Sequence, residues 1–183
     1  MVYVHLAEGF EEIEVTTIVD ILRRGEIETR TVSIGEKRVV GAHGVPITAD
    51  LVYEDADYST CDMIVLPGGI PGTTNLQEHK GLRESILAFS GVNRWIAAIC
   101  AAPMILGQLG ILEGKKATIY PGMEEYLLRA TPLSDPVVVD GKVITSKSPG
   151  TAMVFALELV NAIKGKTTMN TVEEGLHPVW NIL

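Results

Sequence analysis

The sequence has few cysteines and no long apolar run. Its 183 residues contain only Cys61 and Cys100. The two could pair, but two cysteines in a chain of this kind more often remain free thiols in a reducing compartment. No apolar stretch reaches the roughly 18 to 20 residues that a membrane span requires, and the opening MVYVHLA lacks the pattern of a cleavable signal. We therefore expect no membrane association and a cytoplasmic location.

Basic residues are outnumbered by acidic ones. The chain has 15 Lys and Arg against 23 Asp and Glu, a formal net charge of -8. Because a surface of this sign repels polyanions, nucleic acid is not expected as a partner. The histidines show no metal-ligand spacing with either cysteine, which argues against a metal; they are His5, His43, His79 and His177. The phosphate-binding motifs of nucleotide enzymes are also absent, and we expect no cofactor.

Short apolar runs alternate with segments of helical period along the whole chain. The expected strands are residues 2–6, 28–34, 63–66, 95–99 and 117–120, with hairpins at 38–48 and 137–145. The expected helices are 11–24, which would bury Ile13 and Ile18, and 82–89, 101–109, 123–129 and 148–164. This alternation predicts an α/β fold with a mostly parallel sheet and helices on both faces. Residues 1–183 are expected to form a single domain.

Three segments that could carry chemistry follow predicted strands. The Glu-rich segment 11–14 follows the first strand, Gly68 and Gly69 follow the strand at 63–66, and Cys100 follows the strand at 95–99. The carboxyl ends of parallel strands meet at one edge of a sheet, where binding sites form. We therefore expect these segments to lie close together.

Cys100 has the surroundings of a nucleophile elbow. The segment AAICAAP places it between an apolar strand and a helix, with small residues on both sides, as a tight and strained turn requires. The partial positive charge of the helix N-terminus would lower the pKa of the thiol and favour the thiolate. The alternative is a buried, inert cysteine on a core strand.

Glu14 and the two glycines are weaker candidates by themselves. Glu14 stands beside the apolar helix face, so its carboxyl could be buried, protonated and able to donate a hydrogen bond to the sulfur. A solvated helix acid is the alternative. Gly68 and Gly69 offer backbone N–H groups to an oxyanion, or form a plain tight turn. Cys61 precedes a core strand and is expected to be structural.

Four motifs together carry a family resemblance. They are EEIE at 11–14, VLPGG at 65–69, AAICAAP at 97–103 and TSKSPGT at 145–151. In this order and spacing they resemble the ThiJ/PfpI (DJ-1/PfpI) superfamily over nearly the whole chain, most closely the branch of the Parkinson-disease-associated protein and its bacterial relatives. The resemblance implies a flavodoxin-like three-layer sandwich that forms a homodimer.

The resemblance also assigns roles to individual residues. It implies that Cys100 is the reactive cysteine and that a protonated Glu14 is hydrogen-bonded to it. Gly68, Gly69 and the backbone of Ala101 would form an oxyanion pocket. The activities attributed to this branch are cofactor-free glyoxalase or deglycase chemistry on 2-oxoaldehydes such as methylglyoxal or their adducts, oxidative-stress sensing through cysteine oxidation, and chaperone-like holding.

Three positions depart from the family pattern. Protease-like members carry a histidine directly after the cysteine, whereas Ala101 stands here, so the Cys–His pair that peptide hydrolysis needs is missing. Some members of the closer branch carry a pocket histidine where Tyr120 stands, and an arginine near His43. We expect Tyr120 and His43 to line the pocket of an enzyme that acts on a small carbonyl substrate. An oxidative-stress sensor and a holdase are the alternatives.

Overall fold

A seven-stranded sheet forms the centre of the protein. The structure, a computed structural model, describes residues 1–178. The strands lie in the order β10-β11-β7-β6-β1-β2-β5, and every neighbouring pair is parallel except β10 and β11. Their bounds are β1 Val2–Leu6, β2 Thr29–Ser33, β5 Leu51–Val52, β6 Met63–Leu66, β7 Trp95–Ile99, β10 Val137–Asp140 and β11 Val143–Ser146. The predicted, mostly parallel sheet is confirmed.

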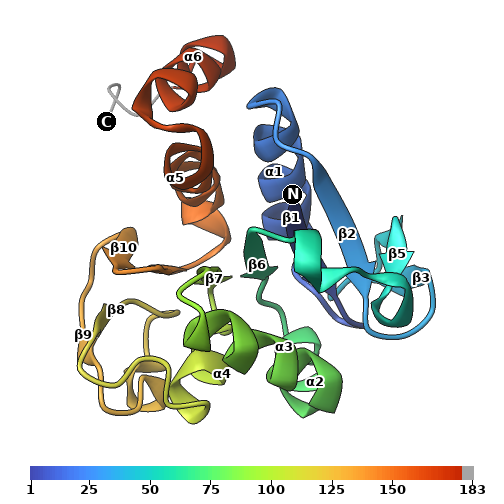
Figure 1. Ribbon diagram of the computed structural model, residues 1–183, viewed down its shortest axis with the longest axis vertical. Helices are drawn as coiled ribbons and strands as arrows, with labels where there is room; N and C mark the ends of the chain where they lie inside the picture. The colour runs from blue at the N-terminus through green and yellow to red at the C-terminus, as the bar shows by residue number, and fades with distance from the viewer. Residues whose placement is uncertain (179–183) are drawn as a thin grey trace.

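Helices cover both faces of this sheet. Helices α1, α5 and α6 pack together on one face, while α3 and α4 pack on the other, with α2 beside α3 (Figure 1). Side chains of β1 alternate between the two layers, since Val4 packs with α1 and α5 and Tyr3 packs towards α3. The predicted three-layer, flavodoxin-like sandwich is confirmed. The helix bounds are α1 Glu12–Arg24, α2 Gly72–Glu78, α3 Lys80–Gly91, α4 Pro103–Gln108, α5 Ala152–Lys164 and α6 Lys166–Leu176.

The winding of the chain reverses between β1 and β6. The chain runs from β1 outward to β2 and β5, then crosses back to β6 and continues outward to β7. Loops that leave the carboxyl ends of strands on either side of such a reversal diverge, and they leave a crevice in which ligands bind. The segments that follow β1, β6 and β7 therefore meet at one edge, as the sequence predicts.

The first turn of α1 differs from the prediction. Ile13, expected in the core, is 56% exposed, whereas Glu12 and Glu14 are buried. Two glycines in facing loops make room for these carboxyls: a Cβ on Gly41 would lie 2.4 Å from the carboxyl carbon of Glu12, and one on Gly68 would lie 3.0 Å from Oε2 of Glu14. The helix consequently presents acids to the protein interior and Ile13 to the surface.

The segment between α4 and β10 is less regular than predicted. The strand expected at 117–120 is reduced to β8 (Lys116–Ala117), which pairs with β9 (Thr131–Pro132) outside the main sheet. The helix expected at 123–129 is wrong, because only a 3-10 turn, η3 (Glu124–Tyr126), forms there. Its first side chain accepts a hydrogen bond from the N–H of Gly122, and Arg129 adopts a left-handed φ of 59° that ends any helix.

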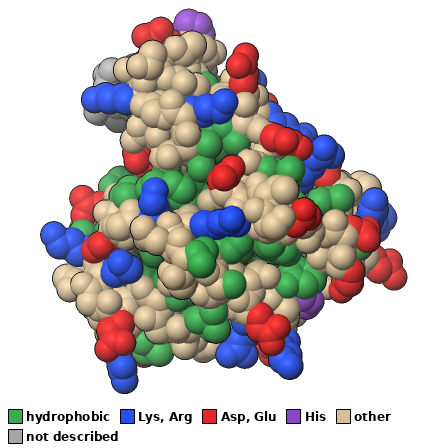
Figure 2. All heavy atoms as spheres, viewed as in Figure 1, with side chains coloured by type: hydrophobic (Ala, Val, Ile, Leu, Met, Phe, Trp, Pro, Cys, Tyr) green, Lys and Arg blue, Asp and Glu red, His purple; other side chains and the backbone are tan. Residues whose placement is uncertain are grey.

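Three further features complete the description of the fold. The predicted hairpin at 38–48 is confirmed as β3 (Arg38–Val40) paired with β4 (Pro46–Thr48). None of the helices in residues 1–178 combines the length and the hydropathy that a bilayer crossing requires. Acidic and basic side chains are interspersed over the face seen in Figure 2, so this face presents no continuous surface of either charge.

Candidate active site

Cys100 lies on a sharp turn at the carboxyl end of β7. Its φ is +62°, a left-handed value that non-glycine residues rarely adopt, and α4 begins three residues later at Pro103. The backbone is held from both sides, because the N–H of Cys100 donates to Ser146 O at 2.9 Å and its carbonyl accepts from Tyr120 N at 2.9 Å. The strand-to-helix elbow predicted from the sequence is present.

Small neighbours make this turn possible. Ala101 and Ala102 are both buried against the elbow. A Cβ on Gly68 would lie 2.6 Å from the Cβ of Cys100 and 3.0 Å from its Sγ, so no larger residue fits at that position without movement of the loop. Cys100 as a whole is 9% exposed. The elbow therefore leaves little of this residue in contact with solvent.

Glu14 reaches this sulfur from the first turns of α1. It is fully buried, and its Oε2 accepts a hydrogen bond of 2.7 Å from the N–H of Gly68. The carboxyl also interacts with the thiol of Cys100, yet Oε1 has no partner that meets hydrogen-bond geometry. Burial raises the pKa of Glu14 to about 7, and the bond from Gly68 only partly offsets this. Glu14 thus has both a free oxygen and a near-neutral pKa.

The thiol of Cys100 does not have the lowered pKa that the sequence predicts. Burial raises its pKa to about 12, and the negative charge of Glu14 is the second cause. The N–H groups of Ala101 and Gly69 act in the opposite direction but are weaker than burial. Since two buried anions in contact are strongly disfavoured, Cys100 and Glu14 do not both ionise at neutral pH, and the pair loses the first of its two protons near pH 7.

The two glycines of the loop after β6 make different contacts. The N–H groups of Gly69 and Ala101 both lie at the sulfur of Cys100, as an oxyanion pocket would require. The N–H of Gly68, predicted to belong to the same pocket, instead binds Glu14. Gly69 has a φ of +90°, and a Cβ there would lie 2.5 Å from the backbone nitrogen of Glu11. The loop therefore needs glycine for close approach at both positions.

His43 lies on the β3–β4 hairpin and contacts acids rather than Cys100. Its Nδ1 is 2.8 Å from Oε2 of Glu12 and 3.7 Å from Oε2 of Glu11, and these carboxylates raise its pKa. Within residues 1–178 this is the one group of three side chains whose ligand atoms lie together, within 4.8 Å, as a metal site would need. Oε1 of Glu12 also accepts the N–H groups of His43 and Val45, so the cluster ties the hairpin to α1.

The place of Glu12 in this cluster was not predicted from the sequence. The two partners are 31 positions apart, and a contact between a helix and a hairpin leaves no spacing signal. Tyr120, also predicted for the pocket, is 45% exposed and is joined to the elbow through its backbone N–H. Its place in a substrate pocket stays a prediction, since its contact with the elbow is made by the backbone.

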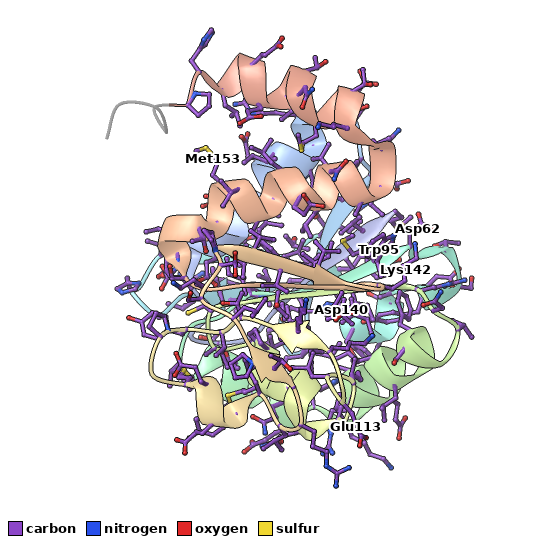
Figure 3. All side chains as sticks on the ribbon, turned by 90° about the vertical axis from the view of Figure 1, so that its left-hand side faces the viewer. Asp62, Trp95, Glu113, Asp140, Lys142 and Met153 are labelled. Carbon is purple, nitrogen blue, oxygen red and sulfur yellow. The ribbon has the colours of Figure 1, made fainter. Side chains whose placement is uncertain are left out.

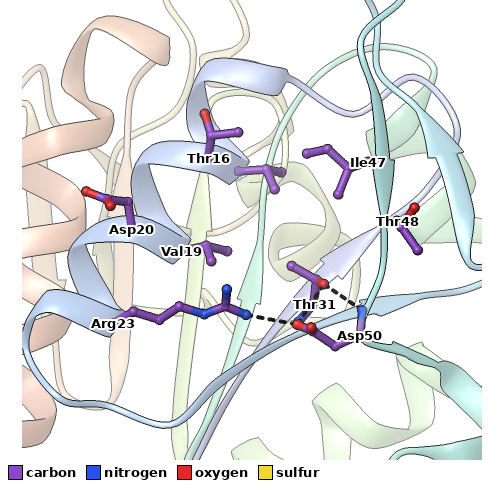
Figure 4. Close-up of a pocket in the computed structure, with 9 residues that line it drawn as sticks. Thr16, Val19, Asp20, Arg23, Thr31, Ile47, Thr48 and Asp50 are labelled. Carbon is purple, nitrogen blue, oxygen red and sulfur yellow. Dashed lines mark hydrogen bonds and ion pairs between the residues drawn. The ribbon is translucent and has the colours of Figure 1, made fainter.

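A cavity of about 400 Å³ lies between α1 and the β3–β4 hairpin (Figure 4). Arg23 donates to Asp50 at 3.0 Å, and Asp50 accepts from the hydroxyl of Thr31 at 3.0 Å, so these polar groups are paired with one another. None of the predicted site residues lines it. The cavity is therefore separate from the Cys100 site.

Known proteins share this architecture. Residues 1–162 match the DJ-1/PfpI family. Protein DJ-1 homolog B of Arabidopsis thaliana is 40% identical over 168 residues, which make up 90% of this chain and 38% of that protein. Protein dj-1beta of Drosophila melanogaster is 35% identical, with 96% of each chain aligned. The solved structure of oxidized Toxoplasma gondii DJ-1 has a TM-score of 0.93 at 31% identity, with 98% of each chain covered.

These matches differ in extent. The chain spans less than half of the Arabidopsis relative, whereas it spans nearly all of the Drosophila protein. The match to the family covers far more than half of the chain and includes the turn at Cys100, the glycine loop and Glu14. The chain therefore belongs to the DJ-1/PfpI family.

Proposed function

We propose that the protein is a cysteine-dependent, cofactor-independent enzyme of the glyoxalase or deglycase type. Its substrates would be small 2-oxoaldehydes such as methylglyoxal, or their adducts. The observation that carries the proposal is Glu14, whose buried carboxyl interacts with the Cys100 thiol and has a pKa raised to about 7. A carboxyl with these properties can take up and return a proton at neutral pH.

The first step is addition of sulfur to the aldehyde. Glu14 accepts the proton of the thiol as Sγ of Cys100 bonds to the aldehyde carbon, which gives a hemithioacetal. The negative charge that develops on the aldehyde oxygen is stabilised by the N–H groups of Gly69 and Ala101. A high resting pKa of the thiol is compatible with this step, because the base that removes the proton lies in contact with it.

The second stage is an internal redox reaction. Glu14, after passing its first proton to the oxyanion, takes the proton from the former aldehyde carbon, which gives an enediolate. Return of that proton to the neighbouring carbon, together with transfer of the hydroxyl proton from the former aldehyde oxygen to the former ketone oxygen, reduces the ketone to an alcohol while the aldehyde carbon is oxidised to a thioester of Cys100. Water then hydrolyses the thioester, which releases lactate from methylglyoxal and restores the thiol. The reaction needs no external oxidant or reductant.

The test is lactate formation without glutathione. Purified protein incubated with methylglyoxal should release lactate, and Cys100→Ala should release none above background. Cys61→Ser is the matched control, because Cys61 is buried and its thiol donates to Met63 O at 3.1 Å. Equal lactate from the wild type and Cys100→Ala would reject the proposal, as would loss of activity in Cys61→Ser with Cys100 intact.

A second candidate is an oxidative-stress sensor. It is favoured by the free Oε1 of Glu14, which when protonated can donate a hydrogen bond to an oxygen added to Cys100. One of the similar solved structures is described as oxidized. Mass spectrometry after mild peroxide should then find a sulfinic acid at Cys100 that Glu14→Leu abolishes. Oxidation of Cys61 to the same extent would reject a specific sensor.

The assembly that we propose is a homodimer acting in the cytoplasm. Ile13 and Val45 are 56% and 52% exposed, and they flank the cluster that joins α1 to the hairpin. Exposed apolar side chains grouped in this way favour contact with another protein surface. Peptide hydrolysis is not proposed, since Ala101 follows Cys100 where a protease would need an imidazole.

A further inference from the structure

A small pocket with three basic side chains lies at the amino edge of the sheet. Its volume is about 110 Å³, and its polar lining consists of Ser90, Asn93, Arg94, Lys115 and Lys142. The remaining lining residues are apolar, and no carboxylate is among them. All three cations are half-buried in a chain whose net charge is -8. A concentration of positive charge in such a chain calls for a physical explanation.

The topology brings these cations together. Arg94 and Lys142 directly precede β7 and β11, which are neighbouring parallel strands, and Ile96 N donates to Lys142 O at 2.9 Å. Lys115 precedes β8 and approaches from the side of the β10–β11 hairpin, 3.8 Å from Asp140. Figure 3 shows Trp95 and Lys142 side by side, with Asp140 near them. Cys100 follows the other end of β7, so the two sites are at opposite edges of the sheet.

The present contacts leave part of the positive charge uncompensated. Arg94 is held by backbone carbonyls: its Nη1 donates to Tyr58 and Cys61 at 3.0 Å and its Nη2 donates to Ser59 at 3.3 Å, which leaves Nε and one N–H of Nη2. The ammonium of Lys142 lies 4.0 Å from the centre of the Trp95 ring. Among the residues that the structure describes, the ammonium of Lys115 has one ion pair, the long contact with Asp140, whose other oxygen accepts the N–H of Lys116. A second anion could therefore be bound without breaking a short ion pair.

Donors of several kinds surround the pocket. Arg94 offers its remaining guanidinium N–H groups, Lys115 and Lys142 offer ammonium groups, and Asn93 and Ser90 offer an amide and a hydroxyl. The pocket also adjoins the carboxyl end of α3, which by itself would disfavour an anion. Its last carbonyls are already occupied by N–H groups, including those of Asn93 and Arg94.

We propose that this pocket binds a small tetrahedral oxyanion of the phosphate class, either inorganic phosphate or the phosphoryl group of a monoester. Multiple charge-assisted donors at different angles match an anion with three or more acceptor oxygens. The volume is of the size of such a group rather than of a nucleotide. The site does not depend on the chemistry proposed for Cys100.

The experiment is a phosphate titration of the full chain followed by Trp95 fluorescence. Trp180→Phe removes the only other tryptophan, so that the signal reports the ring under Lys142. Saturable binding of inorganic phosphate at constant ionic strength is expected, with chloride producing no such change. Lys142→Gln and Lys115→Gln should each weaken phosphate binding by about tenfold. Binding to these two variants is followed by amide NMR shifts, because Lys142 contacts the fluorophore.

Controls separate a site from general attraction. Lys116→Gln is the matched variant, because Lys116 is exposed and lies outside the pocket. Phosphate should bind it as it binds the wild type, and Cys100→Ala should also bind normally. A parallel titration uses phenyl phosphate, a monoester. Whichever of phenyl phosphate and inorganic phosphate has the lower Kd identifies the form that the pocket prefers. No saturation by either ligand, or equal weakening by Lys116→Gln and Lys142→Gln, would overturn the proposal.

Discussion

At the scale of single residues, the proposed chemistry depends on how Cys100 and Glu14 share their protons. The backbone of Cys100 has a strained φ of +62°, and the carboxyl of Glu14 accepts one hydrogen bond from the N–H of Gly68. Because each group is buried and they are in contact, a charge on one disfavours a charge on the other. The pair therefore behaves as a single titrating unit whose reactive form contains one proton.

The first prediction concerns the pH dependence of lactate formation. Activity should rise with pH through about 7, because Glu14 must lose its proton before it can accept that of the thiol. The charge of Glu11 contributes to the raised pKa of Glu14, so Glu11→Gln should move the rise to lower pH. Steady-state kcat/KM across the pH range provides the measurement. An unchanged profile in both Glu11→Gln and Glu14→Gln would contradict this role for Glu14.

The second prediction concerns Gly68. A Cβ at this position would lie 2.6 Å from the Cβ of Cys100, so Gly68→Ala should lower the free energy of unfolding by roughly 1 to 3 kcal/mol. It should also reduce lactate formation, because the displaced loop moves the N–H that holds Glu14. Urea unfolding measures the first effect. Gly35→Ala is the control, since nothing lies within 4 Å of a Cβ there; equal destabilisation of the two variants would contradict the steric argument.

At the scale of elements, strands were easier to predict than irregular segments. Buried apolar runs such as Met63–Leu66 and Trp95–Ile99 have the predicted bounds, because strands covered on both faces are apolar throughout. The helix predicted at 123–129 fails because local hydrogen bonds and a left-handed residue compete with helical ones. Burial of Glu14 was one of the readings of the sequence, but burial of Glu12 in place of Ile13 could not be predicted, since Gly41, which admits Glu12, is distant in sequence.

In the candidate site, too, local features could be predicted from the sequence and features that depend on distant residues could not. The elbow at Cys100 was predictable because its pattern is local: an apolar strand, small residues and a helix. The pKa of the thiol was not, because it depends on burial and on a carboxyl from another helix. Local sequence therefore indicated which residue lies at the elbow, but not the pKa of its thiol.

The third prediction concerns the pH dependence of stability that arises from His5, a buried residue of β1. His5 is fully buried, with Nε2 2.7 Å from the hydroxyl of Tyr58, and burial lowers its pKa to about 4. Below a pH of about 6.5 the unfolded chain binds a proton at this histidine and the folded chain does not, so stability should fall between about pH 6.5 and pH 4, by up to roughly 3 kcal/mol.

A double variant isolates this effect. His5→Leu with Tyr58→Phe removes both hydrogen-bonding partners and leaves no unpaired hydroxyl. Its free energy of unfolding, measured by urea at pH 7.5 and at pH 5, should depend less on pH than that of the wild type. His177→Gln, an exposed histidine at the end of α6, is the control and should retain the full dependence. The same pH dependence in the double variant would show that His5 is not the cause.

At the scale of the whole molecule, the reversal of strand order creates the place for the site. Segments after β1, β6 and β7 supply Glu14, the glycine loop and Cys100 respectively. The resemblance read from four short motifs extends to the complete fold, because these motifs occupy the loops that this topology brings together. The pocket at the opposite edge has no such motif and required the structure to be found.

The fourth prediction concerns assembly. If the surface around Ile13 and Val45 forms the homodimer contact, Ile13→Glu should shift the protein from dimer to monomer, because a buried charge without a partner strongly opposes association. Sedimentation velocity measures the change. Val92→Glu is the control, since Val92 is 67% exposed just beyond α3 and should leave the dimer intact. A wild-type monomer, or dissociation by Val92→Glu alone, would contradict the proposed contact.

The most direct test of the account is the rate at which iodoacetamide alkylates Cys100 as a function of pH, measured in a Cys61→Ser background. Coupling to Glu14 predicts an inflection near pH 7, because the charge that Glu14 gains there opposes ionisation of the thiol, and Glu14→Gln should remove this inflection. Alkylation that follows an ordinary thiol pKa of about 8.5, with the same profile in Glu14→Gln, would contradict the shared proton.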